Sequence, residues 1–141
     1  MKLEDQVTSL DLSNKLKELG VKQEGVFVWT EKVWLGGRSG EPFVAQNSEY
    51  YNDAEYENLC IAFTVAELGE MLPKELYVPY KGNSGKKRKY PQHPHFFFMN
   101  SALVNYTGGN SQERLTQKGD TEANARGKML IYLLENKFIT L

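Results

Sequence analysis

The stretch that decides the fold is DTEANARGKMLIYLLENKF, residues 120–138. It predicts the longest helix of the chain and its main core element. Asp120 or Thr121 can cap its N-terminus, because their side-chain oxygens accept hydrogen bonds from the free N–H groups of the first turn. At about 100° per residue, its apolar positions fall on two nearly opposite faces. The broader face holds Ala123, Gly127, Leu130, Ile131, Leu134 and Phe138, and the narrower face holds Ala125, Met129, Tyr132 and Leu133.

A helix with two apolar faces is either enclosed within one domain or uses one face to bind a partner. We expect enclosure, and the alternative would permit a homodimer. Gly127 costs such a helix about 1 kcal/mol relative to alanine. A close approach by a strand would explain a glycine at this position.

The composition fits one soluble, cytoplasmic domain. A chain of 141 residues can bury a core, and a net charge of −1 gives no overall attraction to nucleic acid or anionic membranes. The single cysteine, Cys60, excludes an internal disulfide, and it lies in an apolar run where a buried structural thiol is expected. The first residues, MKLEDQ, lack the apolar region of a signal peptide. No apolar run nears the ~20 residues that span a bilayer, so we expect no membrane partner.

Residues 9–19 predict a first short helix. Leucines recur there at helical spacing on one face, and Thr8 is a candidate cap. Gly20 ends the helix in the left-handed conformation, with Val21 folding back on Leu16.

Residues 65–72 predict a second short helix, which has the clearest local signal in the chain. Thr64 and Glu67 form a capping box, in which each side chain accepts a hydrogen bond from the other residue's backbone. Pro73 prevents the helix from continuing.

Strands are predicted from short runs of β-branched and aromatic residues. Residues 25–35 (GVFVWTEKVWL) predict a hairpin that turns at Thr30-Glu31-Lys32. Trp29 and Trp34 are expected in the core, and the alternative is an exposed stacking platform. The other strand-like runs are 42–46, 76–80, 95–99 and 102–106. Pro79 places the run 76–80 at a sheet edge or at a bulge. The ranges 36–40, 81–94 and 107–119 predict loops, and the acidic range 47–58 predicts a loop or a ragged helix. The range 81–94 is basic, so the two oppositely charged ranges can meet within one chain or between two chains of a homodimer.

The sharpest candidate site is a basic run followed by an aromatic residue: Lys86, Lys87, Arg88, Lys89 and Tyr90. Such a run can neutralise phosphates while the ring stacks on a base. Arg38 in the glycine-rich stretch 36–40 can contribute, because backbone N–H groups of such loops hold phosphates. That stretch nevertheless lacks the spacing and the lysine of a P-loop. The alternative interpretation of the basic run is an exposed hairpin tip that serves solubility.

Signals for metal binding and catalysis are weak. His93 and His95 would share one face of a strand and could begin a metal site, but no spacing supplies a third ligand. Carboxylates are present, yet none lies in an apolar context that would tune it for acid–base catalysis. We therefore expect no catalytic residue, metal or cofactor.

Three stretches resemble a known group of proteins. Residues 9–23 (SLDLSNKLKELGVKQ), 62–73 (AFTVAELGEMLP) and 121–136 (TEANARGKMLIYLLEN) are similar to small uncharacterised proteins encoded by bacterial prophages and other mobile genetic elements. The resemblance covers about a third of the chain, and it includes the helices but no site. It implies a bacterial or phage cytosolic origin and an α+β fold, and it transfers no catalytic residue. Residues 81–118 depart from the pattern.

These patterns together predict a single α+β domain over residues 1–141. Its antiparallel sheet of about four to six strands would be covered by the C-terminal helix and the two shorter helices. The leading functional hypothesis is a non-catalytic accessory protein of a phage or mobile element that binds a host or phage partner. The second is a binder of a phosphate-bearing ligand (a nucleotide, a signalling nucleotide or single-stranded nucleic acid) through the basic run. The third is a small hydrolase.

Overall fold

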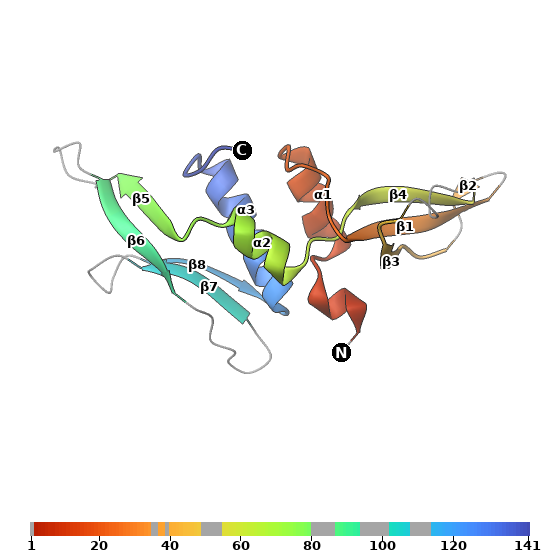
Figure 1. Cartoon of the computed structure of the whole chain (residues 1–141), viewed down its shortest axis with the longest axis horizontal. Coiled ribbons are helices and arrows are strands. Elements are labelled where there is room, and N and C mark those ends of the chain that lie inside the picture. The colour runs from red at the N-terminus through yellow and green to blue at the C-terminus, as the bar shows by residue number, and fades with distance from the viewer. Residues whose placement is uncertain are drawn as a thin grey trace.

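The helices lie between two antiparallel sheets, as Figure 1 shows. The computed structural model describes residues 2–34, 37–38, 40–48, 55–79, 87–93, 102–107 and 114–141. Within these ranges the α+β class is confirmed, with the C-terminal helix packed on a sheet. The eight strands found there divide between two sheets of four instead of forming one sheet.

The first sheet is built around one long strand. Its strands are β1 (Phe27–Trp34), β2 (Gly37–Arg38), β3 (Phe43–Gln46) and β4 (Tyr56–Ile61). Strand β1 pairs with all three others. The predicted hairpin over 25–35 is therefore wrong, because β1 runs straight through Thr30-Glu31-Lys32. Those residues include no glycine or asparagine for a tight turn, and the Thr30 hydroxyl donates a 3.0 Å hydrogen bond to the Glu57 carbonyl of the neighbouring strand.

The second sheet has the order β5-β6-β7-β8. Its strands are β5 (Glu75–Pro79), β6 (Lys87–His93), β7 (Ala102–Thr107) and β8 (Arg114–Gly119). Pro79 lies at the end of edge strand β5, as predicted. Burial alternates along the strands: Leu76, Ala102, Val104 and Tyr106 are buried, whereas Tyr77, Thr116 and Lys118 are exposed.

All four predicted loops contain strand residues, namely β2, the start of β4, β6 and β8. Their polar composition predicts loops, but pairing with neighbouring strands supplies their backbone hydrogen bonds and overrides weak local preference. The predicted strand over 42–46 is confirmed, as is the one over 102–106. The strand predicted over 95–99 lies outside the described residues.

The three predicted helices are confirmed to within a few residues as α1 (Leu10–Glu18), α2 (Val65–Met71) and α3 (Glu122–Glu135). A 3₁₀ turn, η1 (Leu3–Gln6), precedes them. Gly20 has a φ of +84°, and the Val21 N–H donates to the Leu16 carbonyl over 3.0 Å, which is the helix-terminating bond that glycine permits there. The capping box of α2 is present. Thr121, one of the two candidate caps, accepts the Asn124 N–H at α3.

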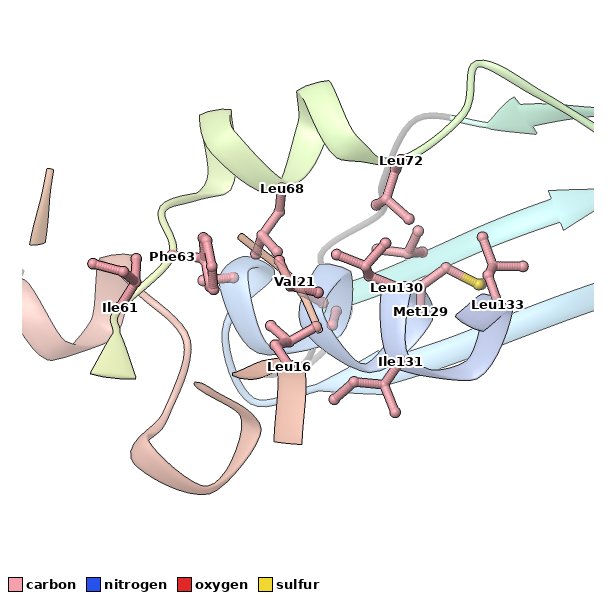
Figure 2. Packing of buried hydrophobic residues seen from close by; sticks show 14 of the residues in the cluster. Leu16, Val21, Ile61, Phe63, Leu68, Leu72, Met129, Leu130, Ile131 and Leu133 are labelled. Atoms are coloured by element: carbon pink, nitrogen blue, oxygen red, sulfur yellow. The ribbon is translucent and has the colours of Figure 1, made fainter. Parts of the chain in front are cut away.

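Helix α3 is enclosed on both of its apolar faces. It contacts α1, α2, β7 and β8. Figure 2 shows side chains of Leu16, Val21 and Leu68 gathered beside it. Met129 and Leu133 of the narrower face are fully buried. Enclosure is thus confirmed, and the face that could have served a homodimer is already covered within the chain.

The close neighbour of Gly127 comes from the α1 region and not from a strand. A Cβ atom at Gly127 would lie 2.9 Å from Cγ2 of Thr8 and 3.8 Å from Cδ1 of Leu12. The predicted strand contact is therefore wrong, although the prediction of a close approach is correct. Only a glycine lets α3 come this near to the segment that begins α1.

Thr8 is a buried connecting residue and not the cap of α1, a position that Ser9 occupies. The Thr8 N–H donates to the Phe63 carbonyl over 2.9 Å, and its hydroxyl accepts the Phe63 N–H over 3.0 Å. That hydroxyl is also hydrogen-bonded to Ser13, while the Thr8 carbonyl accepts the indole N–H of Trp29 over 2.9 Å. Trp29 is thereby held in the core, as expected.

We expect Gly127→Leu to destabilise the protein strongly. The new side chain must enter space held by Thr8 and Leu12, and overpacking a core costs about 1–3 kcal/mol or more. Lys128→Leu places the same side chain at the adjacent exposed position and should change stability by no more than about 0.5 kcal/mol. Urea unfolding of both variants measures the difference, and equal stabilities would contradict the tight contact.

Thr8→Val should lower the free energy of unfolding while keeping the side-chain shape. The buried Phe63 N–H then loses its bond to the threonine hydroxyl, and an unsatisfied buried donor costs about 1–3 kcal/mol. Thr140→Val, at an exposed position, is the matched control. If the two variants melt at the same temperature, the Thr8 hydroxyl does not stabilise the fold.

Candidate functional site

The predicted binding residues lie in two different sheets. The backbone of Lys87, Arg88, Lys89 and Tyr90 belongs to β6, whereas Arg38 belongs to β2. Lys86 lies outside the described residues. Strands β2 and β6 are at opposite ends of the molecule in Figure 1, so the structure does not bring Arg38 to the basic run.

The register of β6 divides the basic run between two faces of the sheet. Residues 87 and 89 are opposite Pro79 and Tyr77, and residues 88 and 90 are opposite Val78 and Leu76. Directly opposed residues share a face, and successive residues alternate between faces. Leu76 is buried and Tyr77 is 56% exposed. Positions 87 and 89 therefore lie on the face of Tyr77, and positions 88 and 90 on the face of Leu76.

We call the side of the second sheet opposite α3 the outer face. Helix α3 packs on β7 and β8, where Ala102, Val104 and Tyr106 are fully buried. The alternating positions of those strands lie on the outer face. Through the pairs Leu103↔Lys118 and Thr107↔Arg114, positions 114 and 118 share that face with the exposed Thr116.

By register, basic residues outnumber acidic ones at the charged positions of the outer face. These positions in the described strands are Lys87, Lys89, Arg114 and Lys118, against Glu75. Among them, Lys118 and Glu75 have exposed side chains. The net charge of −1 for the whole chain does not reveal this local grouping.

Sequence reasoning missed Tyr77, Arg114 and Lys118 as binding candidates. The polar residues of the range 107–119 predict a loop. A usable signal is present, since Thr116 and Lys118 alternate with less exposed residues at the period of a strand. Recognising that they share a surface with Lys87 and Lys89 requires the pairing of β6, β7 and β8.

A cavity of about 670 Å³ lies where η1 meets the N-terminal ends of α2 and α3. Its lining consists of Asp5, Gln6, Phe27, Thr64, Val65, Ala66, Asp120, Thr121 and Glu122. Three of these lining residues, Asp5, Asp120 and Glu122, carry carboxylates. A helix N-terminus contributes about half a positive charge, which is less than the full negative charge of each carboxylate. The balance of charge here disfavours a phosphate ligand.

Asp120 is held ionised at the rim of this cavity. The side-chain amide of Asn124 donates to it over 2.8 Å, and the Thr121 N–H donates over 3.0 Å. The bond from Asn124, followed by the backbone bonds, keeps the pKa of Asp120 below its usual value of 3.8. The neighbouring Glu122 forms an ion pair with Arg126 at 2.9 Å.

A smaller cavity of about 230 Å³ lies beside Cys60. Burial raises the pKa of this thiol to about 11, although Lys17 and Ser13 act in the opposite direction. The thiol is therefore protonated and poorly nucleophilic at neutral pH, in keeping with the predicted structural role. Lys17 donates to the Leu59 carbonyl over 2.7 Å, and Gln23 accepts the Ile61 N–H over 3.0 Å. These two bonds cover backbone groups of edge strand β4.

Metal-binding groups do not cluster in the part of the chain that the structure describes, where no three such side chains come together. His93 ends β6 opposite Asn105, and His95 lies outside the described residues. Across the same ranges, every helix is too short or too polar to span a bilayer.

Comparisons of the chain with protein-family models, with curated protein sequences and with solved structures found no match.

Asp120→Asn should reduce stability in a pH-dependent way. The native carboxylate has a depressed pKa, so its bonds stabilise the fold above the unfolded-state pKa, and this contribution disappears as the pH falls through the folded-state value. The difference in unfolding free energy between wild type and variant should be largest near pH 6 and shrink below about pH 4. It should be small, because the side chain is exposed. Denaturant titrations across that range test this, and a constant difference would contradict it.

Proposed function

We propose that the protein is a non-catalytic binding protein that holds a phosphate-bearing ligand on the outer face of its second sheet. The observation that carries the proposal is the register of β6, which places positions 87 and 89 of the basic run on the outer face of the sheet. Between the two binding hypotheses drawn from the sequence, this favours a phosphate-bearing ligand over a protein partner.

The spacing of the basic positions suits a ligand with several negative oxygens. Residues 87 and 89 are two apart on one strand, so their backbones are about 6.6 Å apart. A phosphate bound there would gain charge-assisted hydrogen bonds from lysine ammonium groups.

An accessory role in a phage or mobile element is part of the same proposal. Its support is the resemblance of residues 9–23, 62–73 and 121–136 to prophage-encoded proteins. Small binding proteins are suited to such a role because they need only sequester or position a molecule.

Neutralising the two lysines of β6 on the outer face should weaken binding of phosphate-bearing ligands. The experiment is a thermal-shift screen of nucleotides, cyclic oligonucleotides and short DNA and RNA, repeated at rising salt. A ligand at a hundred times its Kd stabilises the fold by about 2.7 kcal/mol. Lys87→Gln combined with Lys89→Gln should remove most of the shift, because the two lysines no longer contact phosphate. Each lost phosphate contact should also lower the salt dependence of binding.

The matched control is Lys22→Gln combined with Lys137→Gln. Both lysines are exposed, lie outside the second sheet, and produce the same change in net charge. Equal weakening by both pairs would indicate a general charge effect and contradict a site on the outer face. The proposal is rejected if none of the phosphate-bearing ligands in the screen raises the melting temperature.

A further inference from the structure

We infer that the cavity between η1 and the N-terminal ends of α2 and α3 is a binding site for a small organic amine. The apolar body of the amine lies against Phe27, Val65 and Ala66, and Asp120 holds its ammonium group while Asp5 adds to the negative charge. This site shares no residue with the outer face, so the inference goes beyond the proposed function.

The cavity has the size and the location of a small-molecule site. Its volume of about 670 Å³ falls within the range of about 300–1,000 Å³ that such sites occupy. Phe27 packs against the apolar cluster of the first sheet, and Val65 packs against the apolar cluster around α3. The cavity therefore lies where two packed units meet, which is a frequent place for a ligand site.

The lining offers apolar surface to a ligand. Phe27 and Val65 are half-buried, and Ala66 is exposed on the first turn of α2. The described part of the chain thus leaves these three side chains partly in contact with water. An apolar ligand body that displaces this water is stabilised by the hydrophobic effect.

The carboxylates of the lining have oxygen atoms to offer to a cation. The hydrogen bonds from Thr121 and Asn124 both end on Oδ1 of Asp120. The hydrogen bond from the Lys2 N–H ends on Oδ2 of Asp5. Within the described ranges, Oδ2 of Asp120 and Oδ1 of Asp5 therefore remain as acceptors for a ligand.

Nearby cations are engaged by other groups. Arg126 forms its ion pair with Glu122 at 2.9 Å. Lys128 attracts Asp120 but donates its hydrogen bond to the Lys118 carbonyl over 3.1 Å. Among the described residues, Asp120 forms no ion pair, so an ammonium group can complement its charge through a charge-assisted hydrogen bond.

The arrangement favours an organic cation over a metal ion. Within the described ranges, no three acidic, histidine or cysteine side chains come together as metal ligands. Asp5, Asp120 and Glu122 are therefore distributed around the lining and not gathered at one point. Separated carboxylates in a partly apolar cavity suit a cation that carries an apolar body.

The test compares probes that have similar bodies and different charges. Isothermal titration calorimetry with the full chain measures binding of phenylethylammonium, hexylammonium, phenylethanol and phenylacetate. We expect the ammonium probes to bind, phenylethanol to bind at least about 10-fold more weakly, and phenylacetate not to bind. Asp5→Asn combined with Asp120→Asn should weaken binding of phenylethylammonium by about 10-fold and leave binding of phenylethanol unchanged, because only the charge-assisted bond is lost.

A second variant tests the cavity itself. Ala66→Trp places a large side chain in the cavity from an exposed position, and it should abolish binding of every probe. Glu70→Trp is the matched control, because residue 70 is exposed on the same helix and does not line the cavity. Asp11→Asn combined with Glu18→Gln, both exposed, repeats the change in net charge away from the cavity. Circular dichroism verifies that each variant is folded.

Four results overturn the inference. They are no binding of either ammonium probe, equally tight binding of phenylethanol and phenylethylammonium, equal weakening by the two pairs of charge variants, and unchanged binding to Ala66→Trp. None of them affects the proposed function, because that proposal depends on positions 87 and 89 of β6 and on phosphate-bearing ligands.

Discussion

The arrangement of the molecule depends on the hydrogen bonds of Thr8. This one residue joins Trp29 of the first sheet, Phe63 at the entrance to α2, and Ser13 of α1. It also lies against Gly127, so the same side chain sets how closely α3 approaches. Buried polar networks stabilise a fold only when every member is satisfied. The position of the first sheet relative to the three helices is therefore specified by directional bonds, in addition to the apolar contacts that drive burial.

Local signals predicted the helices well because their causes lie within a few residues. Gly20 and the pair Thr64–Glu67 act on the backbone next to them, so the sequence alone identifies where α1 ends and α2 begins. Strand pairing is different, since the partners of β1 and β6 are other strands, beyond the few residues that a local signal covers. A polar run such as that of β6 is indistinguishable from a loop until its partner strand is known. For the same reason, the sequence identified the basic run as one cluster, whereas the register divides it between two faces.

Net charge was a poor guide to this protein's surface. The near balance of acidic and basic residues suggested that no strongly charged region exists, yet the charges are sorted by location. Basic positions gather on the outer face by register, while carboxylates line the cavity at the helix N-termini. The balance of formal charge therefore differs between parts of the molecule that a single net value averages.

The position of α3 in the chain has a consequence for synthesis in the cell. This helix covers apolar residues of the second sheet, including Val104, but it follows every described strand in sequence. From the end of β7 at Thr107 to the end of α3 at Glu135, the ribosome adds 28 residues, which takes about 1.5–6 s. Apolar collapse occurs in microseconds, so the nascent second sheet must wait for its covering helix on a far longer timescale. During that interval its uncovered apolar face is a surface that chaperones can bind.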